Sequence, residues 1–290
     1  MPTPLHATDP RINSASAIST RTDWQAHLQL GFVKQDGVTR LTERTHSGPL
    51  RVQKALYPEL PSVCHTIIVH PPGGVVGGDQ LSISVRLGNG AAALLATPGA
   101  AKWYRANGRV SRQSVDLKVA AGAALEWLPQ ETILYNGAQV EFDSKIELAA
   151  DATYIGCEIL CFGRAASGEK FDHGSVRQHN QIRRNGTLIW HEQGQLDGSS
   201  PLMQSPFGLA GKTVCATLLA AAPALAPTTI SALRNSAGIE LGVTYMKSIL
   251  AVRYLGDSSE AARHSMLHAW KILRPALLGR LAVVPRIWNT

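Results

Sequence analysis

The stretch VSRQSVDLKV, residues 110–119, carries a clear signal of secondary structure. Val115, Leu117 and Val119 are apolar, and charged residues stand between them. Successive side chains of a β-strand point to opposite faces, so this alternation places apolar groups on one face and charged groups on the other. The stretch therefore predicts a β-strand with one face on a core and the other in solvent.

Similar stretches occur on both sides of this one, and turn sequences such as Asn136-Gly137 and Asp197-Gly198 separate them. We expect further strands at 63–70, 81–87, 91–97, 124–128, 139–148, 153–162, 175–184 and 187–193. No helix is expected between residue 24 and about residue 220. Because strands do not alternate with helices, the pattern argues against a doubly wound nucleotide-binding fold.

The C-terminal third has a different pattern. We expect a short helix at 228–237, strands at 242–246 and 249–255, and then a long helix. Asp257, with Glu260 three residues later, forms a capping-box pattern at its start, and Pro275 is expected to kink or end it. An apolar stripe at helical spacing predicts that this helix packs on the sheet; its members are Met266, Trp270, Leu273 and Leu277. The fold class is therefore mainly β, with about two α-helices in the C-terminal third.

The composition is typical of a globular protein with one large domain. The 290 residues are 44% hydrophobic, enough for a sizeable core. Residues 1–22 are polar and predict a disordered tail, which leaves one domain over residues 23–290. Neither a signal peptide nor a membrane span is expected, and the longest apolar runs, such as 218–226, are too short to cross a bilayer. Without an export signal, the four cysteines favour reduced thiols in the cytoplasm.

The formal net charge is +7, but the basic residues are scattered rather than clustered. This favours an ordinary solvated basic face or contact with an acidic protein partner. Nucleic-acid binding would depend on charge alone, and it predicts a steep salt dependence that we do not expect.

The glycine-rich stretch HPPGGVVGGD, residues 70–79, raises the question of phosphate binding. A phosphate loop needs a helix whose amide groups face the anion, and usually a lysine and a hydroxyl. Here Asp79 follows the glycines, and a strand comes next. GLAGKT at 208–213 does not match a P-loop either, because Pro206 stands where the motif requires glycine. The residues alone predict a tight strand-to-strand turn at 70–79.

Several blocks of unusual composition resemble, in order, the urease accessory protein UreD family, also called UreH. They are HPPGGVVGGDQL from residue 70, TPGAAKWYR (97–105), LEWLPQETILYNGA (125–138), GCEILCFGR (156–164), GEKFDHG (168–174) and PRIWNT near the C-terminus. The resemblance extends from about Trp24 to the C-terminus. It implies a single large β-helical or β-sandwich-like domain of many short strands, with a pair of helices.

The resemblance also implies a function. UreD-like proteins are not enzymes; they bind the urease apoprotein and recruit UreF and the nickel-carrying GTPase UreG into a hetero-oligomeric complex. Together these proteins help to build the dinickel centre of urease. Family members are thought to pass nickel through an internal tunnel, so we expect transient Ni(II) and no permanently bound cofactor.

Three acids are candidates for a nickel path, since Ni(II) accepts carboxylate, imidazole and thiolate donors. Asp79 follows the glycine turn, where the backbone leaves room for an ion or water. Glu158 interrupts an apolar strand, so it needs a partner, water or a metal, and a plain buried salt bridge is an equal alternative. Glu192 adjoins His191, and only one of the two can face a passage. The resemblance places Glu158 and Glu192 in segments where the family carries acids proposed to line the tunnel.

The remaining residues of the blocks are expected to be structural or to contact partners. Lys102, Tyr104 and Arg105, with Trp103, form a cluster typical of interfaces, and packing is an equal alternative. His70 is a candidate for metal contact or hydrogen bonding. The whole set of signature or structural residues is His70, Gly73, Gly74, Gly77, Gly78, Lys102, Tyr104, Arg105, Glu126, Glu131, Arg164 and Glu169.

Other metal-binding side chains are less suitable. Cys157 and Cys161 would lie about 13 Å apart on one strand face, too far for a single ion, so we expect core thiols. His264 and His268 have chelating spacing on a helix, but an exposed pair is expected. The alternative function is a metal-dependent hydrolase that uses carboxylates, although the chain has no HxH or HExxH pattern.

Overall fold

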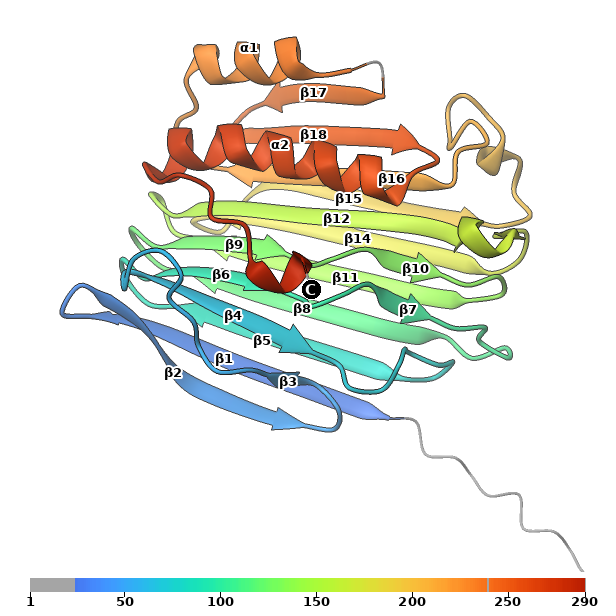
Figure 1. Cartoon of the computed structure of the whole chain (residues 1–290), viewed down its shortest axis with the longest axis horizontal. Coiled ribbons are helices and arrows are strands. Elements are labelled where there is room, and N and C mark those ends of the chain that lie inside the picture. The colour runs from blue at the N-terminus through green and yellow to red at the C-terminus, as the bar shows by residue number, and fades with distance from the viewer. Residues whose placement is uncertain (1–23, 239, 290) are drawn as a thin grey trace, which may run out of the picture.

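A computed structural model describes residues 24–238 and 240–289 and shows two β-sheets that lie face to face (Figure 1). The predicted tail, residues 1–22, lies outside the described residues. The first sheet, here the uncovered sheet, has the order β15 (Thr187–Asp197), β14 (Ser175–Arg184), β11 (Gln139–Leu148), β8 (Ser111–Val119), β5 (Gln80–Leu87), β1 (Gln25–Gln35) and β2 (Val38–Ser47).

The second sheet, here the helix-covered sheet, lies against α2 (Ser259–Leu278) (Figure 1). Its main path is β17 (Leu241–Met246), β18 (Ile249–Gly256), β16 (Val214–Ala221), β12 (Thr153–Arg164), β9 (Ala124–Leu128), β6 (Ala92–Ala96), β4 (Val63–Val69) and β3 (Arg51–Val52). Three short strands pair beside this path: β7 (Ala101–Trp103), β10 (Thr132–Leu134) and β13 (Glu169–Lys170).

The middle of the chain winds between the two sheets. From β5 to β14 the long strands alternate between the sheets, and β5, β8, β11 and β14 are parallel neighbours in one while β6, β9 and β12 are parallel neighbours in the other. Antiparallel strands close both ends of the winding. The predicted β-helical, mainly β fold is confirmed.

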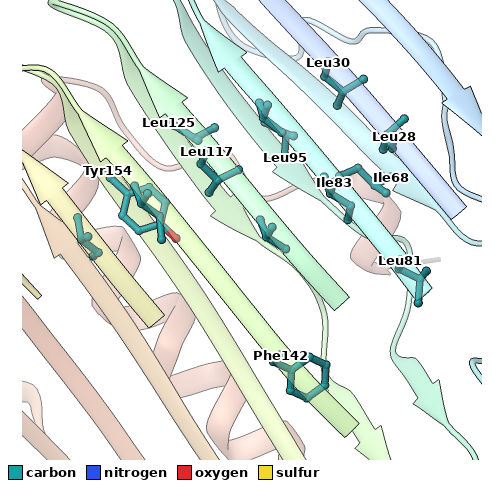
Figure 2. Close-up of a cluster of buried hydrophobic side chains, with 14 of the residues drawn as sticks. Leu28, Leu30, Ile68, Leu81, Ile83, Leu95, Leu117, Leu125, Phe142 and Tyr154 are labelled. Atoms are coloured by element: carbon teal, nitrogen blue, oxygen red, sulfur yellow. The ribbon is translucent and has the colours of Figure 1, made fainter. Parts of the chain in front are cut away.

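The main core fills the space between the sheets (Figure 2). The alternation of residues 110–119 is observed in β8, where Val115, Leu117 and Val119 are buried and Lys118 is exposed. Leu28 and Ile83 from the uncovered sheet meet side chains of the helix-covered sheet in the same layer (Figure 2). Each fully buried side chain of this size stabilises the fold by about 1.5–3 kcal/mol.

A second core lies between α2 and its sheet. Met266, Trp270 and Leu273 are buried there, as the apolar stripe predicts. The helix packs on β12, β16 and β18 (Figure 1). A shorter helix, α1 (Pro227–Ser236), agrees with the expected helix at 228–237.

The predicted N-cap of α2 is wrong, and of the two effects expected of Pro275, the end of the helix is not observed. The N-cap is Ser258, whose hydroxyl accepts a hydrogen bond from the Ala261 amide at 3.1 Å. Asp257 instead accepts a hydrogen bond from Lys212 Nζ at 2.7 Å, so its carboxylate is turned away from the helix. Pro275 does not end the helix, which continues to Leu278 and stops at Gly279 in a left-handed conformation.

Three long strands lie outside the set expected from sequence. They are β1, β2 and β16. β2 is an edge strand with mostly exposed side chains, so it lacks an apolar face, and β16 has apolar neighbours on both faces, so it lacks alternation. In β2 and β16 the period-2 signal is therefore absent, whereas β1 does alternate, with Ala26, Leu28 and Leu30 buried on one face.

Candidate functional site

A cavity of about 350 Å³ lies between the two sheets and reaches the glycine-rich turn at one end. Its walls are largely apolar, with Leu81, Val115 and Ile182 among the lining residues. The polar and charged groups that line it are His70, Thr97, Lys102, Gln113, Gln130, Thr132, Ser144, Tyr154, Cys157, Glu158, Asn180, Glu192 and Thr217. A cavity wall that carries two carboxylates can bind cations weakly, and Lys102 adds a positive charge to the same lining.

Glu158 is the buried acid of this cavity. It lies on β12, and Gln178 Nε2 on β14 donates a hydrogen bond to its Oε2 at 2.6 Å. Burial raises the pKa of Glu158 to about 7; the bond from Gln178 opposes this rise, and the charge of Glu192 adds to it. Within the described part of the chain Glu158 forms no ion pair, so the structure differs from the salt-bridge alternative.

Glu192 is the second acid of the cavity and lies on β15 of the opposite sheet. Arg253 Nη2 on β18 donates a hydrogen bond to its Oε1 at 2.5 Å. The Glu192 side chain is 33% exposed and that of Arg253 is 52% exposed, so this pair lies at the solvent edge. On the sequence Glu192 and His191 were alternatives; here Glu192 lines the cavity and His191 is exposed.

Strand register explains why these residues meet. Glu158 is paired with Thr217 on β16, and Thr217 is paired with Arg253 on β18, so the three form one row across the helix-covered sheet. On the uncovered sheet Glu192 is paired with Asn180. The two rows face each other across the cavity because paired residues point to the same side of a sheet.

Asp79, the third predicted acid, does not line the cavity. It is buried, and its Oδ2 accepts a hydrogen bond from the Val76 amide at 3.0 Å. The structure therefore gives Asp79 a turn-stabilising contact, and its predicted contact with nickel stays a prediction. His70 does line the cavity, and burial lowers its pKa while the charge of Asp79 acts in the opposite direction.

The glycines of the turn allow close packing. A Cβ at Gly77 would lie 2.1 Å from the carbonyl oxygen of Ala106, and one at Gly74 would lie 2.5 Å from the Tyr104 ring. Gly78 has φ +97, a conformation that L side chains rarely adopt. The hydroxyl of Tyr104 donates to the carbonyl of Gly73 at 3.0 Å, so Tyr104 packs on the turn.

The other members of the predicted interface cluster divide into two groups. Trp103 is buried and packs edge to face on Phe142 at 5.0 Å. Lys102 and Arg105 are exposed and could contact a partner. Sequence proximity alone did not separate these two groups.

Three of the signature glutamates form ion pairs, and two of these glutamates, Glu126 and Glu131, are buried. Glu126 is buried and accepts hydrogen bonds from Trp270 Nε1 at 2.6 Å and from Arg274 Nε at 2.9 Å. Glu131 accepts two bonds of 2.7 Å from Arg263.

The third signature glutamate is at the surface. Glu169 accepts two hydrogen bonds from Arg164, at 2.8 Å and 3.2 Å. These bonds lower the pKa of Glu169, and burial opposes that effect. The Arg164 guanidinium also lies 4.4 Å from the centre of the Tyr135 ring.

The remaining metal-binding side chains are placed as expected. Cys157 and Cys161 are buried on β12, and burial raises the pKa of both thiols. His264 and His268 are exposed on α2. Among residues 24–238 and 240–289 no group of three or more His, Cys, Asp or Glu side chains is placed to hold a metal ion. The described helices include none that is both long and apolar enough to cross a membrane.

Sequence reasoning did not identify Arg253, Gln178 or Arg274. Arg253 is the single charged residue in the β18 sequence ILAVRYLG, and Arg274 lies beside an apolar stripe; both positions are signals that could have been used. Gln178 has no such signal, because polar residues surround it on β14.

Comparison with known proteins identifies the family. The family described as "UreD urease accessory protein" matches residues 25–289. A urease accessory protein UreD from Janthinobacterium sp. (strain Marseille) is 58% identical over 283 residues, which cover 96% of this chain and 95% of that protein. Proteins of the same name from Nitrosospira multiformis and Dechloromonas aromatica are 49% and 50% identical, over 92% of this chain and 98% and 95% of theirs. The chain belongs to the UreD family of urease accessory proteins.

Proposed function

We propose that this protein is a non-catalytic scaffold for nickel insertion into urease, and that Ni(II) passes through the cavity between its sheets. In this proposal the protein binds the urease apoprotein in the cytoplasm and recruits UreF and UreG. Nickel is the cargo of the complex and is not a resident cofactor.

One observation carries the proposal: the cavity brings Glu158 and Glu192 together from opposite sheets. Their charges interact, since the charge of Glu192 raises the pKa of Glu158. Two carboxylates can hold a divalent cation, but they leave most of its coordination positions to water. Such a site binds weakly enough to release the ion, as transfer requires.

The chemistry of the walls also supports a transfer route. Gln178 and Asn180 offer amide groups beside the two acids, and Thr217 offers a hydroxyl. These groups can exchange hydrogen bonds with the water of a hydrated ion. The rest of the lining is largely apolar, with a positive charge at Lys102 beside the glycine-rich turn.

The experiment is urease activation in cells that lack their own copy of this protein. The wild type, Glu158→Gln and Glu192→Gln would each be supplied. Glu147→Gln is the matched control, because Glu147 lies in β11 and does not line the cavity. The readouts are the nickel content of purified urease and pull-down of UreF and apo-urease.

We expect both cavity variants to assemble with the partners and to deliver much less nickel, whereas Glu147→Gln behaves like the wild type. Normal nickel delivery by both cavity variants would contradict the carboxylate route. If the wild type fails to restore activity or to bind the partners, the scaffold proposal is wrong. Turnover of a substrate by the isolated chain would instead support the hydrolase alternative.

A further inference from the structure

Arg253 is an unusual residue for its strand. Its neighbours in β18, ILAVRYLG, are apolar or aromatic, and most of them are buried. Its side chain is 52% exposed, and its guanidinium reaches the other sheet and binds Glu192. The partner of this partly exposed charge is an acid of the cavity wall.

The pair lies beside the cavity: Glu192 lines it, and Arg253 binds Glu192 without being one of the lining residues. β15 is the last strand of the uncovered sheet, and β18 lies near the corresponding end of the helix-covered sheet (Figure 1). The ion pair connects these two strands across the gap between the sheets. Because Glu192 lines the cavity and is also partly exposed, the pair lies where the cavity meets solvent.

The ring of Trp190 lies beside the Arg253 guanidinium. It precedes Glu192 by two residues on β15, so both side chains point to the same side of the strand. The Arg253 guanidinium carbon lies 5.9 Å from the centre of the Trp190 ring, within the range of a cation–π contact. Arg253 therefore has two contacts on the opposite sheet.

We propose that Arg253 is a latch on the cavity: it closes the mouth at the β15–β18 edge and occupies the cation position at Glu192. This inference rests on the proposed function, because the cation that displaces Arg253 is the nickel cargo. A metal ion that binds Glu192 must separate Glu192 from Arg253, and removal of the metal restores the pair. While the latch is closed, the positive charge of Arg253 lies against the Glu192 carboxylate, which limits capture of other cations.

The first experiment measures access to the mouth without any metal. Cys215 on β16 is partly buried two residues from Thr217, and the charges of Glu192 and Arg253 both act on its pKa. We would follow its modification by methyl methanethiosulfonate at several pH values in the wild type, Arg253→Ala and Arg253→Lys, with peptide mass spectrometry. The rates are compared per thiolate, because loss of the Arg253 charge raises the pKa of this thiol. Cys64, which is buried on β4, is the internal control.

We expect Arg253→Ala to speed modification of Cys215 by about fivefold, the scale of one partly exposed ion pair. Arg253→Lys should change the rate less because it keeps the charge, and the rate at Cys64 should not change in any variant. An unchanged rate at Cys215 would overturn the latch and leave the carboxylate route intact. Equal acceleration at Cys64 and Cys215 would also overturn the latch, because it would show general loosening.

The second experiment measures competition for Glu192. Equilibrium dialysis with NiCl₂ would use protein that carries His264→Ala and His268→Ala, since the exposed histidine pair would otherwise bind nickel at the surface. In this background Arg253→Ala should bind nickel about fivefold more tightly. Adding Glu192→Gln should abolish that gain.

The outcomes separate the latch from the proposed function. Nickel binding that depends on Glu158 and Glu192 but not on Arg253 overturns the competition and supports the route. An absence of Glu158-dependent binding in every variant, measured at nickel concentrations up to the millimolar range, would overturn both. Tighter binding by Arg253→Ala that Glu192→Gln removes supports both.

Discussion

Glu126 and Glu158 lie on adjacent parallel strands of one sheet, yet their surroundings are opposite. Glu126 on β9 faces α2, where Trp270 and Arg274 donate hydrogen bonds to it. Glu158 on β12 faces the cavity, where a neutral amide is its hydrogen-bond partner. A buried acid with a fixed cation joins two parts of a fold, whereas a buried acid without one remains available to a proton or a metal ion.

The cluster around Glu126 is larger than one pair. Arg274 is fully buried, and its Nη2 also binds Glu59 at 2.5 Å. Glu59 contacts His65 Nε2 at 2.7 Å, and Arg274 Nη1 donates to the carbonyl of Leu281. One guanidinium thus connects α2, the sheet and the C-terminal segment.

The strongest test of this comparison is Arg274→Met, which leaves Glu126 and Glu59 without their cation. We expect a loss of about 3–5 kcal/mol in the free energy of unfolding, because the buried acids become unpaired. Urea denaturation monitored by fluorescence measures it. Arg253→Met is the matched control and should cost about 0–1 kcal/mol, since that pair is partly exposed. Equal losses in the two variants would show that the buried Arg274 cluster stabilises the fold no more than the partly exposed Arg253–Glu192 pair does.

The second test uses the pH dependence of Glu158. Its pKa is about 7 in the folded protein against 4.5 when unfolded, so the folded state holds the proton more tightly. This contribution to stability is complete below pH 4.5 and is lost as pH rises to 7, by about 3 kcal/mol. Glu158→Gln should lack this loss and should be the more stable protein at pH 8. Parallel stability curves for the two proteins would show that folding does not shift the pKa of Glu158.

A third, smaller effect is expected from Arg263→Ala. It leaves Glu131 without its bidentate partner, but the Arg263 side chain is 35% exposed, and water can reach the site. We expect a loss of about 1–2 kcal/mol in the free energy of unfolding. A loss as large as that of Arg274→Met would mean that the exposure of an ion pair does not determine how much it contributes to stability.

The smallest effect concerns Glu59. Its pKa is lowered on folding, whereas that of Glu158 is raised, so stability depends on pH in the opposite direction. Burial would raise the pKa of Glu59, but hydrogen bonds from Arg274 and His65 hold it below its usual value. Its contribution to stability is therefore present above the unfolded pKa and is lost as pH falls through the lower folded value. The stability difference between the wild type and Glu59→Gln should shrink in acid, as thermal unfolding at several pH values would measure. A difference that grows in acid would contradict the assignment.

Several features could be predicted from sequence because they depend on near neighbours. Alternation in residues 110–119 predicted β8, and the stripe of Met266, Trp270 and Leu273 predicted the buried face of α2. β2 was not predicted, because most of its side chains are exposed and it lacks an apolar face. At the start of α2 the sequence predicted Asp257 as the cap, but Asp257 binds the distant Lys212 and Ser258 caps the helix.

The sequence by itself determined the mainly β class, the family and the presence of acids in apolar strands. Only the tertiary structure decided what each acid does. Glu126 is bound by Arg274, Glu158 by Gln178 and Glu192 by Arg253. These partners are far apart in the chain, and strand register and sheet stacking bring them together. Since a shift of register by one residue would turn each side chain to the opposite face, sequence spacing alone could not assign the partners.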